Sequence, residues 1–300
     1  MLGQPPAPVL QKSDSFNGTA ATEREVRMRP KADGSTRGIL HAAAGRSRYT
    51  LNRYEPCGTL RPFIDHYWIV RYDVPVHEPY TQRVLSFPNV HLTFEHEPDG
   101  RRALIYGVPR RPFERVLRGE GRTLGIRFRA GGFRPYWRSD VSRLTGRTIP
   151  AAELFGPAAA EWMEAVLDAG DDEAMARQAE SILLQRVPEI DAQAELAAHV
   201  VDLAMRDRSI LRVEQLSGQA GPTVRQLQRL FQRYVGVTPK RVIRRFRLQE
   251  AAERIEKDPS LSLAELAHEL GYFDQAHFIR DFKAVLGQPP AAYRQAAGGR

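Results

Sequence analysis

The sequence predicts an α+β protein, in which an antiparallel β-rich N-terminal domain is followed by a helical connector and an all-α C-terminal domain. Short segments between residues 49 and 150 alternate apolar with polar residues and are separated by Gly and Pro, which is typical of antiparallel strands. From residue 151 the apolar residues recur at the helical period instead. Within the last hundred residues, one helical pattern occurs twice.

The composition fits a protein of about two domains, since the chain has 300 residues, of which 42% are hydrophobic. No run of eighteen apolar residues is present, so no transmembrane helix is expected. The single cysteine, Cys57, cannot form an internal disulfide, and we expect a quiet structural thiol in a cytoplasmic protein. The net charge of +8 either indicates a polyanionic partner or reflects an arginine-rich genome.

The N-terminal part divides into two segments. Residues 1–48 are rich in Pro, Gly, Ser, Thr, Ala and Arg without periodicity, and we predict that they are mostly disordered. Residues 49–155 are predicted to form a compact antiparallel barrel or sandwich that serves as a sensor or interaction domain. Its strand-like segments read HYWIVRYDV (66–74), VLSFPNVHLTFEHE (84–97) and TLGIRFRAGG (123–132).

The connector, residues 156–208, is predicted to hold three helices with acidic starts, which suits the positive end of a helix dipole. We expect it to join the two domains or to form a dimer surface. The helices read GPAAAEWMEAVLDAG (156–170), DDEAMARQAESILLQRV (171–187) and DAQAELAAHVVDLAMRD (191–207).

The C-terminal domain, residues 209–296, contains an internal repeat with a spacing of 51 residues. Each copy follows a short helical segment that ends in glycine, VEQLSGQAG (213–221) and LAELAHELG (263–271), so each is predicted to be a helix-turn-helix unit. One longer helix, KRVIRRFRLQEAAERIEK (240–257), separates them. The repeated pairs are Arg229 with Arg280, Phe231 with Phe282, Gly236 with Gly287, and Pro239 with Pro290.

The second helix of each unit has one apolar face and one polar or basic face. In the first unit, Thr223 is the predicted N-cap, and the helical period puts Leu227 and Phe231 opposite Arg225 and Arg229. In the second unit, Asp274 is the predicted N-cap. Arg and Gln can make bidentate contacts to the edges of guanine and adenine. The polar faces therefore predict two recognition helices for the DNA major groove.

The region between residues 215 and 249 has no acidic residue but many cations, which is typical of an electrostatic footprint on a nucleic acid. The alternative is a basic surface without a partner. A set of arginines and lysines with helical spacing is predicted to contact phosphates: Arg233, Lys240, Arg241, Arg244, Arg245 and Lys283.

These residues resemble the AraC family of bacterial transcription regulators. The resemblance covers residues 210–294 and rests on LQRLFQRYVGVTPKRVIRRFRLQEA (227–251) and SLAELAHELGYFDQAHFIRDFKAVLGQPPAAYR (262–294). It implies two helix-turn-helix units, bridged by a rigid helix, in successive major grooves. One departure, Gly218 and Ala220 in the first helix of the first unit, implies a less rigid unit. The implied base-reading residues are Arg225, Gln226, Gln228 and Arg229, and Gln275, Ala276, His277 and Arg280.

The N-terminal segments LRPFIDHYWIV (60–70) and GIRFRAGGFRPYW (125–137) are similar to the β-rich domain of a poorly characterised subgroup of that family. The similarity implies a sensor or interaction domain without naming a ligand. Aromatic residues of this domain line an effector pocket or simply form the barrel core. The four candidates are Trp68, Phe94, Phe128 and Trp137.

The sequence thus predicts a sequence-specific regulator of transcription that binds double-stranded promoter DNA, without catalytic residues, metal or cofactor. His91 and His96 are expected on opposite faces of a strand, which makes them a poor metal pair. RNA polymerase, a small-molecule effector and a second copy of the chain are the further expected partners. Two alternatives remain open: an enzymatic or ligand-binding β-domain that the DNA-binding part only locates, and a nonspecific DNA binder.

Overall fold

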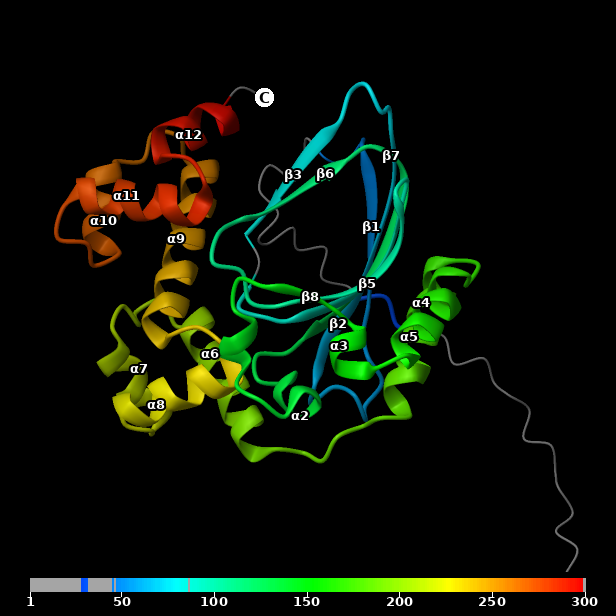
Figure 1. Cartoon of the computed structure of the whole chain (residues 1–300). Helices are drawn as coiled ribbons and strands as arrows, with labels where there is room; N and C mark the ends of the chain where they lie inside the picture. The colour runs from blue at the N-terminus through cyan, green and yellow to red at the C-terminus, as the bar shows by residue number, and fades with distance from the viewer. Residues whose placement is uncertain (1–27, 32–44, 46, 86, 299–300) are drawn as a thin grey trace, which may run out of the picture.

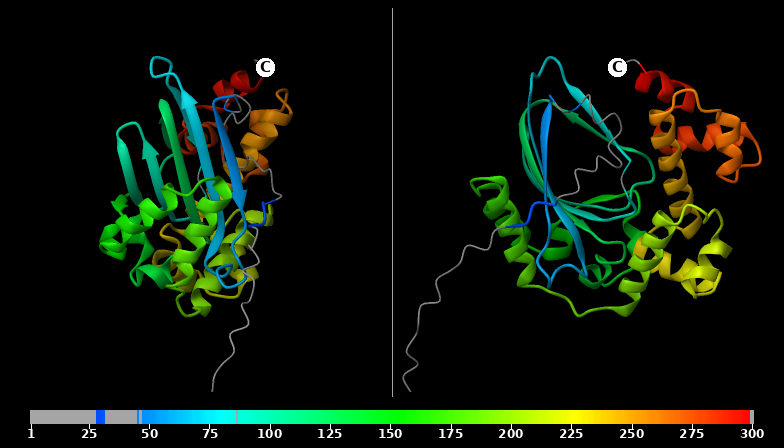
Figure 2. Two further views of the ribbon diagram at one scale, coloured as in Figure 1. Left: turned by 90° about the vertical axis from the view of Figure 1, so that its right-hand side faces the viewer. Right: turned by 180° about the vertical axis from the view of Figure 1, so that it is seen from behind.

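The computed structural model describes residues 28–31, 45, 47–85 and 87–298. Its N-terminal half is built on a six-stranded antiparallel sheet in the order β1-β2-β7-β4-β5-β8, and a separate two-stranded sheet, β3-β6, faces it (Figures 1 and 2). The strands are β1 (Tyr49–Tyr54), β2 (Ile64–Val74), β3 (Tyr80–Val84), β4 (His91–Glu97), β5 (Gly100–Tyr106), β6 (Phe113–Leu117), β7 (Gly119–Phe128) and β8 (Thr148–Pro150).

The two faces of the large sheet have different surroundings because side chains alternate along each strand. One face carries Ile69, Phe94 and Phe128, which are at most 1% exposed and belong to the main hydrophobic core. The other face carries His66 and Trp68 and looks toward β3 and β6. The expected antiparallel β-rich domain is confirmed, and so is the α+β class of the chain.

The other regular elements of the described chain are helices. Short elements follow the sheet, and longer helices occupy the connector and the C-terminal domain (Figure 1). They are α2 (Arg134–Trp137), η1 (Val141–Leu144), α3 (Ala152–Phe155), α4 (Ala158–Leu167), α5 (Asp172–Leu184), α6 (Ala192–Arg206), α7 (Val213–Ala220), α8 (Val224–Leu230), η2 (Phe231–Val235), α9 (Pro239–Lys257), α10 (Leu263–Glu269), α11 (Gln275–Leu286) and α12 (Pro290–Gly298). None of them is long and apolar enough to cross a membrane.

The three expected connector helices form, and they differ in what they contact. Helices α4 and α5 pack on the core face of the sheet, and Asp172 at the start of α5 pairs with Arg71 of β2 at 2.5 Å. Helix α6 packs against α9 and also contacts the N-terminal domain, where Ala194 and Ala197 approach Gly131. Helix α6 thus lies between the two domains and contacts both. The dimer role of the connector stays a prediction.

Part of the segment predicted to be disordered is packed. Met28 is 5% exposed and belongs to the main core, and Lys31 pairs with Asp65 at 3.0 Å. Within the segment predicted to be mostly disordered, an apolar side chain and an ion pair thus hold residues 28–31 against the sheet. Most of the remaining residues of this segment lie outside the described part of the chain.

The two copies of the internal repeat have the same local structure at their equivalent glycine, phenylalanine and proline residues. Gly236 and Gly287 each end a recognition helix with positive φ, +89° and +85°, a backbone region that side chains other than glycine rarely adopt. Phe231 and Phe282 are both 0% exposed. Each glycine is followed three residues later by a proline that opens the next helix, α9 or α12, where a missing N–H costs nothing.

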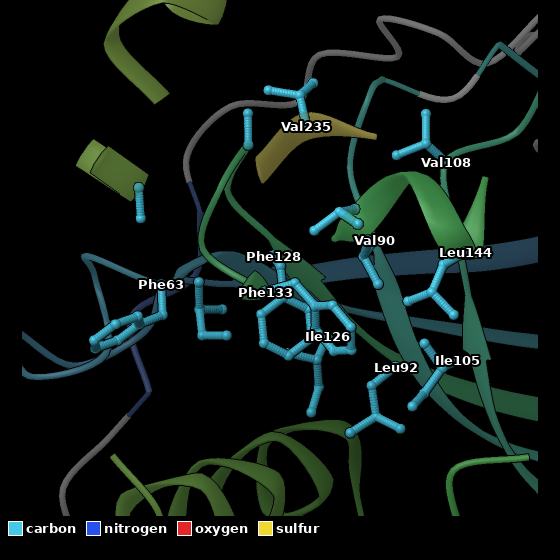
Figure 3. Close-up of a cluster of buried hydrophobic side chains, with 14 of the residues drawn as sticks. Phe63, Val90, Leu92, Ile105, Val108, Ile126, Phe128, Phe133, Leu144 and Val235 are labelled. Carbon is cyan, nitrogen blue, oxygen red and sulfur yellow. The ribbon is translucent and has the colours of Figure 1, made fainter. Parts of the chain in front are cut away.

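The two helix-turn-helix units attach to the rest of the molecule differently. The first unit shares the core of the N-terminal domain, where Val235 joins Val90, Val108 and Leu144 (Figure 3). The second unit has a hydrophobic cluster of its own, to which the N-terminal domain contributes Leu85. Helix α9 runs between the units (Figure 1). The first unit is thus fixed by an extended shared core and the second by a small contact.

Candidate nucleic-acid interface

The first recognition helix, α8, presents its polar face to solvent. Thr223 caps the helix as predicted, and its hydroxyl accepts a hydrogen bond from the Gln226 N–H at 3.3 Å. Arg225, Gln228 and Arg229 are exposed, whereas Leu227 on the opposite face is buried. The Gln226 amide oxygen is occupied by the cap, accepting from the Thr223 N–H at 2.8 Å. Only the amide nitrogen of Gln226 is then left as a donor for a base.

The helix widens into a π turn over Phe231–Val235, which differs from the continuous α-helix that the period predicts. The Gly236 N–H donates to the Phe231 carbonyl at 2.7 Å, five residues back. The wider turn lets Tyr234 reach the N-terminal domain and the connector, where its hydroxyl donates to Asp191 at 2.7 Å. Arg233 lies beside this ring, 4.0 Å from Asp140, at the end of the helix away from the tip.

The second recognition helix, α11, begins at the predicted cap. The Asp274 carboxylate accepts from the His277 N–H at 2.6 Å. The predicted base-reading side chains of this helix are exposed: Gln275, Ala276, His277 and Arg280, with Lys283 one turn farther along. The His277 imidazole lies 3.6 Å from Asp281 and packs edge-on against Tyr272. Its orientation is therefore fixed by the helix-turn-helix unit itself.

The basic residues of α9 do not form a single surface. Lys240 and Arg241 are exposed, and the Arg241 guanidinium donates to the Arg110 carbonyl of the N-terminal domain. Arg244 pairs with Asp281 of α11 at 2.6 Å, which ties the second recognition helix to α9. Its Nε atom is buried without a hydrogen-bond partner among the described residues. Arg244 therefore has a structural partner as well as a partly exposed face.

Arg245 was predicted to contact a phosphate, and the structure corrects this prediction. Its side chain is buried, with 7% exposed, and burial lowers its pKa to about 10. It lies one turn after Arg241, on the side of α9 that meets the N-terminal domain. A phosphate on the outer surface cannot reach it in this arrangement. Arg247, which also fell in the basic stretch, is 3% exposed and donates to the Ala204 carbonyl at 2.6 Å.

A cavity of about 610 Å³ lies between the large sheet and the β3-β6 pair, within the range of small-molecule sites. Of the four predicted aromatic candidates, Trp68 lines this cavity. Phe94 and Phe128 lie on the core face, and Trp137 packs on Phe133 in α2. The alternation of strand side chains explains the separation. In the described part of the chain, no group of three or more His, Cys, Asp or Glu could hold a metal.

Two histidines in this cavity should make the stability of the protein fall at mildly acidic pH. Burial, and next the charge of Arg127, lower the pKa of His91 to about 3. Burial lowers the pKa of His66 to about 4, although a hydrogen bond to Asp65 opposes this. The unfolded chain takes up these protons near pH 6.5, so the folded state loses stability as pH falls from about 6.5 toward 4, by at most about 1.4 kcal/mol per pH unit for each histidine.

Urea unfolding between pH 4 and 8 measures this effect. The His91→Gln variant, which keeps an acceptor for the Trp68 N–H, should show a shallower slope below pH 6.5. His77→Gln, at an exposed site, is the control and should keep the slope of the parent protein. Equal slopes in all three proteins would exclude His91 as a titrating group of the folding reaction.

Comparison with known proteins finds matches to two parts of the chain. Residues 216–296 match a family model described as a helix-turn-helix domain, and residues 52–150 match a domain of unknown function, DUF6597. The probable transcription factor PqrA of Proteus vulgaris is 33% identical over 86 residues, which cover 28% of this chain and 69% of PqrA. The chain belongs to the AraC family of transcription regulators.

Other members of the AraC family match the same segment. The transcriptional activator RhaS of Pectobacterium atrosepticum is 33% identical over 85 residues, which are 28% of this chain but 30% of RhaS. The match thus spans less than a third of that relative. Among solved structures, an AraC-type regulator from Chromobacterium violaceum is 24% identical, with a TM-score of 0.31. The match covers 36% of this chain and 97% of the chain of that regulator. ToxT from Vibrio cholerae is 10% identical, with a TM-score of 0.37, and the match covers 83% of this chain and 98% of the ToxT chain.

Proposed function

We propose that the protein is a sequence-specific regulator of transcription that binds double-stranded promoter DNA. The observation that carries the proposal is the pair of capped recognition helices, α8 and α11, each of which exposes polar and basic side chains opposite a buried apolar side chain, Leu227 in α8 and Phe278 in α11. Arg229 and Arg280 occupy equivalent places in the two units. Two reading elements on one chain suit a site that spans two successive turns of the major groove.

Affinity and specificity come from different side chains in this proposal. The exposed Lys240, Arg241 and Lys283, together with Arg233 and the open face of Arg244, neutralise phosphates. The exposed residues in the first turns of α8 and α11 read base edges. Contact with RNA polymerase, pairing with a second copy and a cytoplasmic location belong to the same proposal.

We further propose that the DNA-binding domain responds to a small molecule in the cavity of the N-terminal domain. Two side chains between β3 and β4 support this coupling, because they line the cavity and also contact the DNA-binding domain. Leu85 belongs to the hydrophobic cluster of the second unit. The Phe87 ring lies 5.8 Å from that of Phe246 in α9. A bound ligand that displaced either side chain would change how α9 packs against the N-terminal domain.

Fluorescence anisotropy on the DNA upstream of the gene tests the main proposal. A scrambled duplex of the same composition is the control, at several salt concentrations. We expect the upstream DNA to bind at least about a hundredfold more tightly, with a preference that survives moderate salt. Equal, strongly salt-dependent binding of both duplexes would favour the nonspecific binder. Absence of binding to either would favour the β-rich domain as the active part.

A further inference from the structure

The cavity of the N-terminal domain is lined by aromatic and cationic side chains, which indicate the chemical class of its ligand. We infer that its ligand is a small organic anion with a flat or extended apolar body, whose acidic group lies at the arginine-rich end of the cavity next to α9. The inference rests on the proposed ligand response and adds the class of the ligand. Three features carry it: an aromatic floor, a surplus of cations and an unsatisfied hydrogen-bond donor.

The floor of the cavity consists of two aromatic rings laid across the sheet. Trp68 of β2 pairs with Gly125 of β7, and a Cβ atom at Gly125 would lie 2.0 Å from the indole. Tyr72 pairs with Gly121 in the same way, and a Cβ there would lie 2.2 Å from the phenol ring. The absence of side chains on the two glycines therefore lets both rings lie flat on β7. Such a floor favours an apolar body that stacks or lies along it.

The charges of the lining are strongly unequal. Among the described residues it carries six arginines and two glutamates. Both glutamates already have partners: Glu95 pairs with Arg115 at 2.7 Å, and Glu114 pairs with Arg83 at 2.8 Å. At the rim, by contrast, Arg110, Arg111 and Arg147 form no ion pair with any described acidic residue. This lining gives the cavity a positive potential, which attracts an anion.

The cations gather at one end of the cavity. The strand registers place His91 beside Arg127 and Tyr106, while Tyr72 pairs with Tyr49 toward the other end. Tyr106 ends β5 and pairs with Thr148, so the neighbouring rim arginines lie at the His91 end. This end also faces α9, because the Arg110 carbonyl accepts from Arg241. The buried Arg245, which has no described anionic partner, lies one turn farther along α9.

His91 supplies a hydrogen-bond donor at the same end. Its Nδ1 atom accepts from the Trp68 indole N–H at 3.1 Å, so the proton of the neutral ring must be on Nε2. No described residue accepts a hydrogen bond from that Nε2–H. A ligand carboxylate is an acceptor that could take this bond and approach the arginines at once. A carboxylate there would also raise the pKa of His91, which burial and next the charge of Arg127 keep low.

Isothermal titration calorimetry of the full chain without DNA tests the ligand class. The probes are four carboxylates, benzoate, 2-naphthoate, octanoate and decanoate, each with its neutral primary amide, at up to about 10 mM. We expect at least one carboxylate to bind at least about tenfold more tightly than its amide. Amides that bind as well as their acids, or no binding by any carboxylate, would overturn the inference.

Variants locate the acidic group. Arg111→Gln combined with Arg147→Gln changes exposed side chains at the rim and should weaken the carboxylate about tenfold while leaving the amide within about twofold. Arg118→Gln, an exposed arginine outside the lining, is the matched control and should change neither. At pH 7, NMR should show a shift of the His91 Nε2 resonance with the carboxylate that the amide does not produce. Equal losses for acid and amide, or an unchanged His91 resonance, would contradict the assignment.

The two proposals fail separately. Specific DNA binding is measured by anisotropy without any ligand, whereas the ligand class is measured by calorimetry without DNA. A protein that binds its upstream DNA specifically but prefers amides would retain the proposed regulatory function and lose only the anionic ligand. A protein that binds carboxylates as described but no DNA would retain the ligand class and lose the regulator.

Discussion

Replacing Phe282 with alanine should unfold the second helix-turn-helix unit and abolish its contribution to DNA binding. The ring is 0% exposed and packs edge-on against Phe278 at 5.7 Å and Tyr293 at 5.6 Å. Loss of a buried phenylalanine ring costs about 3–5 kcal/mol. Because this unit has its own hydrophobic cluster, the loss should appear as an early unfolding transition separate from that of the main core.

Urea unfolding followed by circular dichroism measures the loss, with DNA affinity measured in parallel. Phe273→Ala is the matched control, since it removes the same atoms from a ring of the same unit that is 98% exposed. That change should stay within about 0.5 kcal/mol of the parent protein. Similar stability of the two variants would mean that Phe282 is not packed as described. Unchanged DNA affinity with a lost second unit would mean that α11 does not read DNA.

Replacing Arg229 with alanine should weaken binding to the specific DNA site by about 1–3 kcal/mol and relax the preference at one base pair. Arg229 is exposed in the second turn of α8, on the face opposite Leu227. Its reach toward the groove is set by the Thr223 cap at the start of the helix. Because a guanidinium makes paired hydrogen bonds to guanine, loss of the side chain should affect one base pair more than its neighbours.

Anisotropy on a set of single base-pair variants of the site measures the preference. Lys240→Ala is the control, because this exposed residue at the start of α9 is proposed to contact a phosphate. It should weaken all duplexes about equally and reduce the salt slope by about one. If Arg229→Ala gave this uniform result instead, Arg229 would be a phosphate contact and not a reader of bases.

The C-terminal domain was predictable from the sequence because its signals are local. Thr223 and Asp274 cap their helices through hydrogen bonds that reach only three residues along the chain. The repeated phenylalanines follow from the helical period, and the repeated glycines from the positive φ at the end of each helix. A π turn at Phe231–Val235 was not predictable, because contacts with distant residues such as Asp191 accompany it.

The roles of individual cations required the tertiary structure. Arg244 and Arg245 are neighbours in one basic stretch, and their composition gives no reason to separate them. In the folded chain Arg244 pairs with Asp281 of another helix, while Arg245 is buried on the side of α9 that meets the N-terminal domain. Which face of a helix another domain covers depends on residues that are more than a hundred positions away.

The sequence by itself determined the two reading helices, their caps and the α+β order of the chain, because periodicity and capping act within a few residues. The tertiary structure alone decided that Trp68 lines a cavity while Phe94 and Phe128 form the core. The alternation of side chains along a strand places these aromatic residues on opposite faces of a sheet. It does not tell which of the two faces the helices cover. That face is the one on which α4 and α5 pack. Their apolar side chains stabilise the folded state only where they are buried against other apolar side chains and removed from water.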